Sequence, residues 1–210
     1  MWRGAMWVVV MLALSVGALT CFIQHTEPDV PAYLRGMGGD FTLRSAHGPV
    51  SLHDFRGKVG LLYFGYTHCP DACPMALSVI ARALRGMSAA QRDRVYALFV
   101  SVDPKRDTPE HLQAYTAFFD RRIIGLTGTT RQLTALAVKY RMDFEVPQAP
   151  ADAAYTVRHS RFIYLLDAEG RVVALFDEKT PSARLRRALR RWLYAASVRR
   201  MWKDTQGERR

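Results

Sequence analysis

The sequence predicts an α/β fold in which helices cover a sheet of buried strands. Residues 59–64 and 95–102 are almost entirely apolar and show no alternation with polar residues. Such runs are typical of strands that are covered on both faces. A helix is expected after each of them, and near the C-terminus the turn Asp167–Gly170 joins two further apolar runs that we expect to pair antiparallel.

The first 25 residues predict a membrane anchor. No charged residue occurs from Ala5 to Gln24, which is about the length needed to cross a bilayer. Arg3 precedes this stretch and acidic residues follow it, so the positive-inside rule places the N-terminus in the cytoplasm. We therefore expect residues 1–25 to be a single transmembrane helix of a bacterial inner membrane, with the soluble domain in the periplasm. A cleaved signal peptide and lipidation at Cys21 are the alternatives.

Glycines and prolines in residues 26–38 predict a linker, and a domain is expected over residues 39–180. The strands expected in this domain are 41–44, 50–52, 59–64, 95–102, 123–126, 155–166 and 171–176, of which the first two form a hairpin. The helices expected are 75–85, 109–119 after the N-cap Thr108, and a helix capped by Thr129 or Thr130 that ends at Tyr140. Residues 86–94 and 143–154 are expected to be connections. This order predicts a thioredoxin-like sandwich with an added N-terminal β-hairpin.

Helical spacing of apolar residues predicts which side chains face the core. In the helix 109–119 these are Leu112, Tyr115, Phe118 and Phe119, and in the helix ending at Tyr140 they are Leu133, Leu136, Ala137 and Tyr140.

The C-terminal residues 181–210 predict a basic helix and tail. The apolar face of this helix comprises Leu185, Leu189, Trp192, Leu193 and Ala196. From Arg184 onward there are ten basic and two acidic residues, a net charge of +8 out of +11 for the whole chain. Two interpretations remain open: a docked helix with a solvated tail, or contact with anionic lipid or an acidic partner. Basic and aromatic residues do not interleave as in nucleic-acid-binding proteins, so we expect no nucleic-acid partner.

Two cysteines, Cys69 and Cys73, lie where a buried strand gives way to a helix. Unpaired backbone N–H groups at a helix N-terminus favour the thiolate, which is the reactive and metal-binding form of cysteine. Three residues separate the two thiols, whereas a thioredoxin-type redox pair has two. At this spacing the sulfurs can face one direction and hold a metal, or they can close a disulfide. Two merely packed cysteines are the remaining alternative.

Three segments of the chain resemble the SCO/SenC family. They are Cys69-Pro70-Asp71-Ala72-Cys73-Pro74, Ser101-Val102-Asp103-Pro104-Lys105-Arg106-Asp107-Thr108-Pro109 and His159-Ser160, and the resemblance extends from about Gly38 to Phe176. It implies a thioredoxin-like, membrane-anchored, copper-binding protein with Cys69, Cys73 and His159 as copper ligands. It also implies a role in assembling the dinuclear copper centre of cytochrome c oxidase. The expected partners are a copper donor chaperone and the copper-bearing oxidase subunit.

The chemistry of the three side chains agrees with this expectation. Two thiolates and one imidazole form a soft ligand set that suits copper, as Cu(I) or Cu(II), and zinc less exclusively. Three ligands leave a position open, through which an acceptor can take the metal. The alternative is a periplasmic thiol-disulfide oxidoreductase that reduces the cysteines of the oxidase subunit or of another copper protein, with Cys69 and Cys73 as its redox pair. In that case the protein is an enzyme and His159 is dispensable.

A third alternative is a peroxide-reducing thiol enzyme, with Arg158 or Arg161 supplying positive charge. His68 is expected to neighbour the metal site without binding, and Asp71 to orient the loop or tune the thiols. Met75 is expected to pack against the core, with a thioether contact to the metal as the alternative. The other histidines, His47, His53 and His111, are expected to be solvated.

Overall fold

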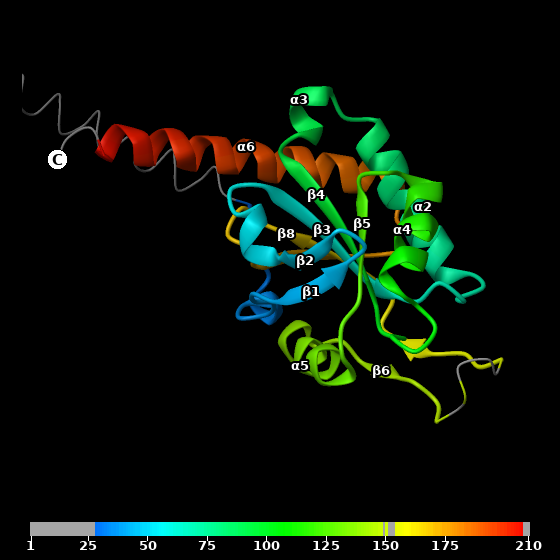
Figure 1. The fold of residues 1–210 in the computed structure, drawn as a ribbon. Coiled ribbons are helices and arrows are strands. Elements are labelled where there is room, and N and C mark those ends of the chain that lie inside the picture. The colour runs from blue at the N-terminus through cyan, green and yellow to red at the C-terminus, as the bar shows by residue number, and fades with distance from the viewer. Residues whose placement is uncertain (1–27, 149, 151–153, 208–210) are drawn as a thin grey trace, which may run out of the picture.

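The computed structural model describes residues 28–148, 150 and 154–207. A five-stranded sheet with the strand order β5–β4–β3–β8–β9 forms its centre (Figure 1). The strands are β3 (Val59–Gly65), β4 (Val95–Ser101), β5 (Ile123–Leu126), β8 (Phe162–Leu166) and β9 (Val172–Asp177). β3, β4 and β5 run parallel, while β8 is antiparallel to both β3 and β9. Every residue of β3 is buried, which confirms that this strand is covered on both faces.

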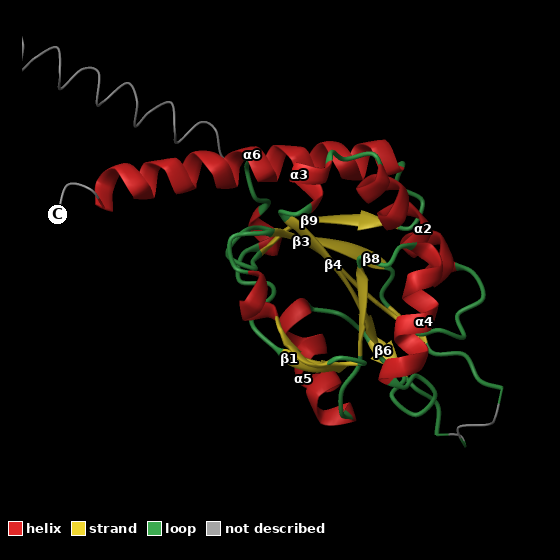
Figure 2. Cartoon of the chain, turned by 45° about the horizontal axis from the view of Figure 1, so that its top comes forward, coloured by secondary structure: helices red, strands yellow, loops and turns green. Residues whose placement is uncertain are grey.

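Helices cover both faces of the sheet, as Figures 1 and 2 show. One face carries α2 (Ala72–Arg85), α4 (Pro109–Phe119) and α6 (Ser182–Gly207), and the other carries α5 (Thr130–Tyr140). Successive side chains of a strand point to opposite faces. Accordingly Tyr63 stacks on Phe99 under α4, whereas Phe64 meets Tyr140 of α5 with ring centres 5.5 Å apart. The arrangement confirms the predicted thioredoxin-like α/β sandwich.

The predicted N-terminal hairpin is present. It comprises β1 (Thr42–Ser45) and β2 (Gly48–Ser51), which pair antiparallel and are joined by a two-residue turn. The short 3-10 helix η2 (Leu52–Phe55) follows, and a bridge between Arg44 and Thr127 holds the hairpin beside the end of β5.

Several element boundaries differ from the predictions. α2 begins at Ala72 rather than Met75, so Cys73 lies inside its first turn. The predicted connection 86–94 contains α3 (Ala89–Arg92), whose N-cap Ser88 forms a capping box with Gln91. The expected loop 143–154 begins with β6 (Phe144–Glu145), which pairs with β7 (Arg158–His159). This pairing divides the single strand expected at 155–166 into β7 and β8.

The predicted core face of α4 is wrong in one residue. Leu112 and Thr116 are buried, whereas the Phe118 side chain is 85% exposed. Phe118 follows Leu112 by six residues, which places it about 120° away from Leu112 around the helix axis. The four core residues predicted for α5 are all buried.

The predicted linker packs against the domain at several of its described residues. Residues Ala32–Leu34 form the 3-10 helix η1, and Leu34 is only 1% exposed. Gly38 also pairs with Arg171 beside β9. The predicted anchor, residues 1–25, lies outside the described residues. Among the helices that the structure does describe, none is long and apolar enough to span a bilayer.

α6 belongs to the domain for much of its length. Leu185, Leu189, Trp192 and Leu193 are buried as predicted, and α6 packs along α2. Ala195 is buried in place of the predicted Ala196. Arg190 donates to the carbonyl of Gly86. The predicted boundary at residue 181 therefore separates two segments that share one core.

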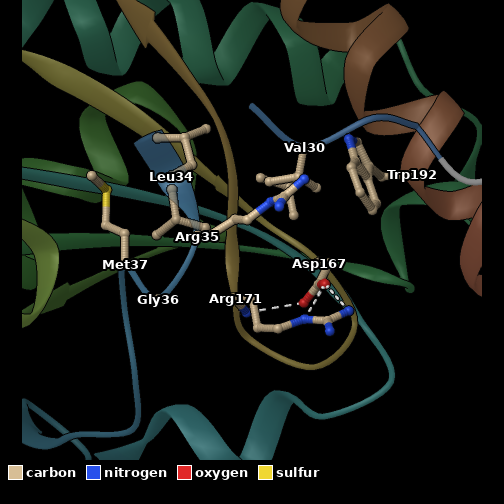
Figure 3. A pocket seen from close by; sticks show the side chains of 10 residues that line it. Val30, Leu34, Arg35, Gly36, Met37, Asp167, Arg171 and Trp192 are labelled. Atoms are coloured by element: carbon tan, nitrogen blue, oxygen red, sulfur yellow. Dashed lines mark hydrogen bonds and ion pairs between the residues drawn. The ribbon is translucent and has the colours of Figure 1, made fainter. Parts of the chain in front are cut away.

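A cavity of about 340 Å³ lies between the η1 segment, the β8–β9 turn and α6 (Figure 3). Trp192 lines one side of it, and an ion pair between Asp167 and Arg171 lines another. Leu166 pairs with Gly60 near the start of β3, whereas the two cysteines follow the end of β3. The cavity is thus at the opposite end of the sheet from the cysteine motif.

Candidate metal centre

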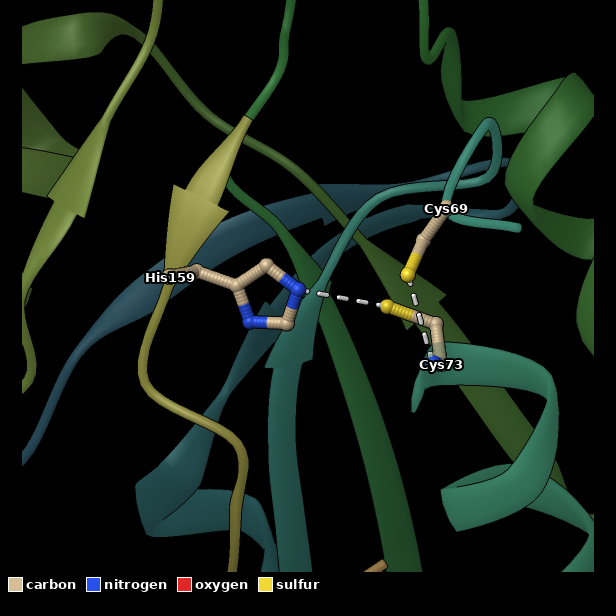
Figure 4. Close-up of side chains that lie close together, drawn as sticks. All are labelled: Cys69, Cys73 and His159. Carbon is tan, nitrogen blue, oxygen red and sulfur yellow. Dashed lines mark hydrogen bonds between the residues drawn. The ribbon is translucent and has the colours of Figure 1, made fainter. Parts of the chain in front are cut away.

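Two elements and a loop bring Cys69, Cys73 and His159 together. Cys69 lies in the loop after β3, Cys73 lies in the first turn of α2, and His159 ends β7 (Figure 4). One potential ligand atom from each residue lies within 4.8 Å of the other two. The Cys73 Sγ and the His159 Nε2 are 3.5 Å apart. The structure therefore places the predicted ligand set at one point, and both thiols are free.

The orientation of the His159 ring leaves a lone pair on Nε2. Its Nδ1 lies 3.0 Å from the backbone carbonyl oxygen of Ser160. A carbonyl oxygen can only accept a hydrogen bond, so Nδ1 carries the proton and Nε2 is unprotonated in the neutral ring. Tyr63 and Tyr66 meet the ring edge-on and hold it in this orientation. Metal-binding histidines have this arrangement, with the second ring nitrogen donating to a fixed acceptor.

The two thiols differ in electrostatic environment. The Cys73 thiol donates a hydrogen bond to the Cys69 sulfur. This contact, together with the backbone N–H groups of Cys73 and Asp71, holds the pKa of Cys69 far below its usual range despite burial. Burial, together with the negative charge on Cys69, raises the pKa of Cys73. The metal-free site thus holds one thiolate and one thiol, and binding a metal through both sulfurs releases a proton from Cys73.

Gly65 makes room for the Cys73 sulfur at the end of β3. A Cβ atom at this position would lie 2.6 Å from the Cys73 Sγ and 2.8 Å from the Phe99 ring. Contacts this short do not occur in folded proteins, so glycine is needed for the close approach of strand and sulfur.

Asp107 fixes the start of the cysteine loop. Its carboxylate is fully buried and accepts the Thr67 backbone N–H at 2.9 Å and the Thr67 hydroxyl at 2.6 Å. It also accepts the Ser101 hydroxyl at 2.6 Å. Because Thr67 follows β3 and Ser101 ends β4, this carboxylate ties the ends of two neighbouring strands together just before Cys69.

A second cluster fixes the segment that leads to His159. Arg106 pairs with Asp103 at 2.6 Å and donates to the Tyr155 carbonyl at 3.0 Å. The Tyr155 hydroxyl donates to Asp103 at 2.9 Å. Sequence reasoning singled out this segment only through the family resemblance and gave Asp103, Arg106 and Asp107 no role. A partial signal was available, because four of the five residues directly after the predicted strand 95–102 are charged. The structure adds that two of them, Asp103 and Asp107, are fully buried.

Of the other residues for which the sequence predicted a position, some lie where they were expected and one does not. His68 is next to the site with its side chain 48% exposed, and Asp71 is the N-cap residue of α2 whose backbone contributes to the low pKa of Cys69. The prediction that Met75 packs in the core is wrong, because Met75 is on the exposed side of the first turn of α2. His47 and His53 are exposed, and His47 contacts the Gln113 side chain.

A thioredoxin-like sheet with two thiols at a strand-to-helix junction and a facing imidazole defines a class of proteins that bind soft metals or exchange disulfides. Comparison with known families narrows this class. The SCO1/SenC family model matches residues 32–194. The chain belongs to the SCO1/SenC family, which confirms the resemblance of the three motifs.

Individual relatives and solved structures support this family membership. The chain is 35% identical over 204 residues to Protein sco1 of Schizosaccharomyces pombe, covering 90% of this chain and 77% of the relative. The structure of Bradyrhizobium japonicum ScoI with copper bound is 39% identical, with a TM-score of 0.67 over 75% of this chain and 99% of that one. The crystal structure of yeast Sco1 with copper bound is 34% identical, with a TM-score of 0.65 over 74% and 89% of the two chains.

Proposed function

We propose that this protein binds copper through Cys69, Cys73 and His159 and delivers it to the dinuclear copper centre of cytochrome c oxidase. The convergence of the three ligand atoms within 4.8 Å carries this proposal. Two structures similar to this chain, from Bradyrhizobium japonicum and yeast, are described as having copper bound. The copper is cargo, received from a donor chaperone and passed to the copper-bearing subunit.

The ligand set suits binding followed by release. Thiolate and imidazole donors favour Cu(I) and also accept Cu(II). Three protein donors leave a coordination position open, and an acceptor thiolate, thioether or imidazole can enter there before the ion leaves. Cys69 is the partly exposed ligand whereas Cys73 is buried, so we expect exchange to proceed on the Cys69 side.

Copper titration of the reduced chain under anaerobic conditions tests the proposal. A Cys21→Ser background removes the third thiol. We expect one copper per chain, with affinity lowered at least tenfold by His159→Ala and by Cys73→Ser. His53→Ala is the control, because His53 is an exposed histidine outside the site. Unchanged copper affinity in His159→Ala contradicts the ligand assignment.

The alternative function is thiol-disulfide exchange. A partly exposed Cys69 thiolate beside the Cys73 thiol favours it. In this reaction the Cys69 thiolate attacks a partner disulfide, and Cys73 then displaces the partner. The dithiol here becomes a disulfide, while the partner gains two electrons and becomes a dithiol. Thiol-disulfide exchange is favoured over copper delivery if His159→Ala keeps full disulfide-reducing activity and its copper binding is unaffected.

We infer that the protein acts at a bacterial inner membrane, with an N-terminal helix as anchor and the domain in the periplasm. Exposed basic residues of α6, among them Arg187, Arg191 and Lys203, support additional contact with anionic lipid. Sedimentation of the chain that begins at residue 28 with vesicles tests the lipid contact. We expect the chain to bind phosphatidylglycerol vesicles but not phosphatidylcholine vesicles, and we expect salt and R187Q/R191Q to weaken this binding. Equal binding to both lipids contradicts the proposed contact with anionic lipid.

A further inference from the structure

A pair of imidazoles lies beside the Cys69 loop, on the side of Asp107. His68 is in the loop directly before Cys69, and His111 is in the first turn of α4. Their ring centres are 5.9 Å apart. Both side chains are about half exposed, at 48% and 46%, so solvent ions reach them.

Hydrogen bonding determines which nitrogen of His68 carries the proton. The Thr67 hydroxyl donates its single proton to Asp107 at 2.6 Å. The same hydroxyl oxygen lies 3.0 Å from His68 Nδ1 and can therefore only accept there. Nδ1 of His68 is thus the donor, and Nε2 keeps an available lone pair. His159 has the same tautomer, so both imidazoles are prepared to bind a metal through Nε2.

His111 completes the pair. Its Nδ1 is 3.9 Å from Asp107 Oδ1, and His68 Nδ1 is 3.8 Å from the same atom. These distances are too long for hydrogen bonds, so rotation of the half-exposed His111 side chain costs no hydrogen bond to Asp107. The buried Asp107 carboxylate lies behind both rings and favours positive charge between them. Because a metal–nitrogen bond to histidine is about 2.0 Å long, a modest rotation lets one ion join the two rings.

We propose that His68 and His111 form a second metal site that accepts Cu(II). Imidazole nitrogens suit Cu(II), whereas Cys69 and Cys73 suit the softer Cu(I). This site would be an entry point, given the copper-delivery function proposed above. Copper bound at His68 is adjacent in sequence to Cys69, and ligand exchange without change of oxidation state moves it into the cysteine site.

The test removes the first site so that the second is measured alone. The untagged chain with Cys21→Ser, Cys69→Ala, Cys73→Ala and His159→Ala is titrated with Cu(II), and the electron paramagnetic resonance spectrum is recorded. We expect one Cu(II) with two nitrogen couplings. Added His68→Gln or His111→Gln should lower the affinity at least tenfold. Added His53→Gln should leave it unchanged, because His53 is an exposed histidine elsewhere on the domain.

A second measurement uses the chain with its cysteines intact. The Cu(I)-loaded protein receives Cu(II), and paramagnetic broadening of the histidine ring signals is followed by nuclear magnetic resonance. Selective broadening of His68 and His111 supports the second site. Equal broadening of His47 and His53, or Cu(II) binding that survives His68→Gln and His111→Gln, overturns it. Neither result bears on copper binding by Cys69 and Cys73, so the two proposals fail separately.

Discussion

The guanidinium carbon of Arg106 lies over the ring of Tyr155, 3.5 Å from the ring centre. Arg106 follows β4, while Tyr155 precedes β7, so this contact joins two segments about fifty residues apart in sequence. Asp103 binds both partners and closes a three-residue cluster. The cluster includes none of the three metal ligands, yet it fixes the chain that presents His159.

Tyr155→Ala is expected to weaken copper binding by about tenfold. The change removes a cation–π contact and a hydrogen bond to a carboxylate, which together contribute about 1–3 kcal/mol toward ordering the segment. A segment held less firmly presents His159 in the binding position for less of the time, and the apparent affinity falls accordingly. Copper affinity and thermal unfolding of the metal-free protein are the measurements.

A double-mutant cycle separates positioning from general destabilisation. In a His159→Ala background, Tyr155→Ala should no longer change the copper affinity, because the ligand that it positions is absent. Arg122→Gln is the matched control, since Arg122 pairs with Asp120 beside β5 in a similar buried-acid contact. A full tenfold loss in the His159→Ala background shows that Tyr155 acts by another route.

Gly65→Ala is expected to abolish high-affinity copper binding. The new methyl group would occupy the space of the Cys73 sulfur, 2.6 Å away, and would push it or α2 out of place. Such overpacking costs about 1–3 kcal/mol of folding free energy. Gly60→Ala in the same strand is the control, because its Cβ would meet the Tyr96 ring at the far end of β3. Both variants should be destabilised, and Gly60→Ala should keep its copper affinity at a temperature where both are folded.

Alkylation of the metal-free thiols should distinguish the two cysteines. With its pKa held far below the usual range, Cys69 stays a thiolate as the pH falls from 8 to 6. Its labelling rate with iodoacetamide should therefore fall by much less than the tenfold per pH unit of an ordinary thiol. Cys73 is buried with a raised pKa and should label slowly. Peptide mapping assigns each rate. In Cys73→Ala the donor to Cys69 is lost, and the labelling of Cys69 should regain a steep pH dependence.

The elements with strong sequence signals were predicted closely. Continuous apolar runs identified β3 and β4, and Thr108 with Pro109 marked the start of α4. Short elements were missed, since β6 and β7 consist of two residues each and exist because tertiary contacts bring them together. The exposure of Phe118 and Met75 shows the same limit, because apolar character alone does not determine which side of a helix is covered.

The candidate site could be predicted from the residues only in part. The spacing of Cys69 and Cys73 indicates a shared metal or a disulfide, but His159 lies 90 residues further along the chain. Its position depends on the pairing of β6 with β7 and on the contact between Arg106 and Tyr155. Both join residues far apart in sequence, so no local pattern predicts them. The expected element order allowed His159 to lie near the cysteines, and the family resemblance identified it as a ligand.

Leu189→Ala is expected to destabilise the domain by about 2–5 kcal/mol, because a fully buried leucine leaves a cavity when truncated. This residue lies on α6, within the segment that the sequence suggested as a separate basic helix and tail, and α6 packs along α2. Since Cys73 lies in the first turn of α2, copper affinity should also fall when the domain is near its unfolding midpoint. Tyr194→Ala is the control on the same helix, where a side chain 58% exposed should change stability by no more than about 0.5 kcal/mol. Urea unfolding measures the free energy of unfolding of both variants. If both substitutions lower it by the same small amount, the domain folds without α6.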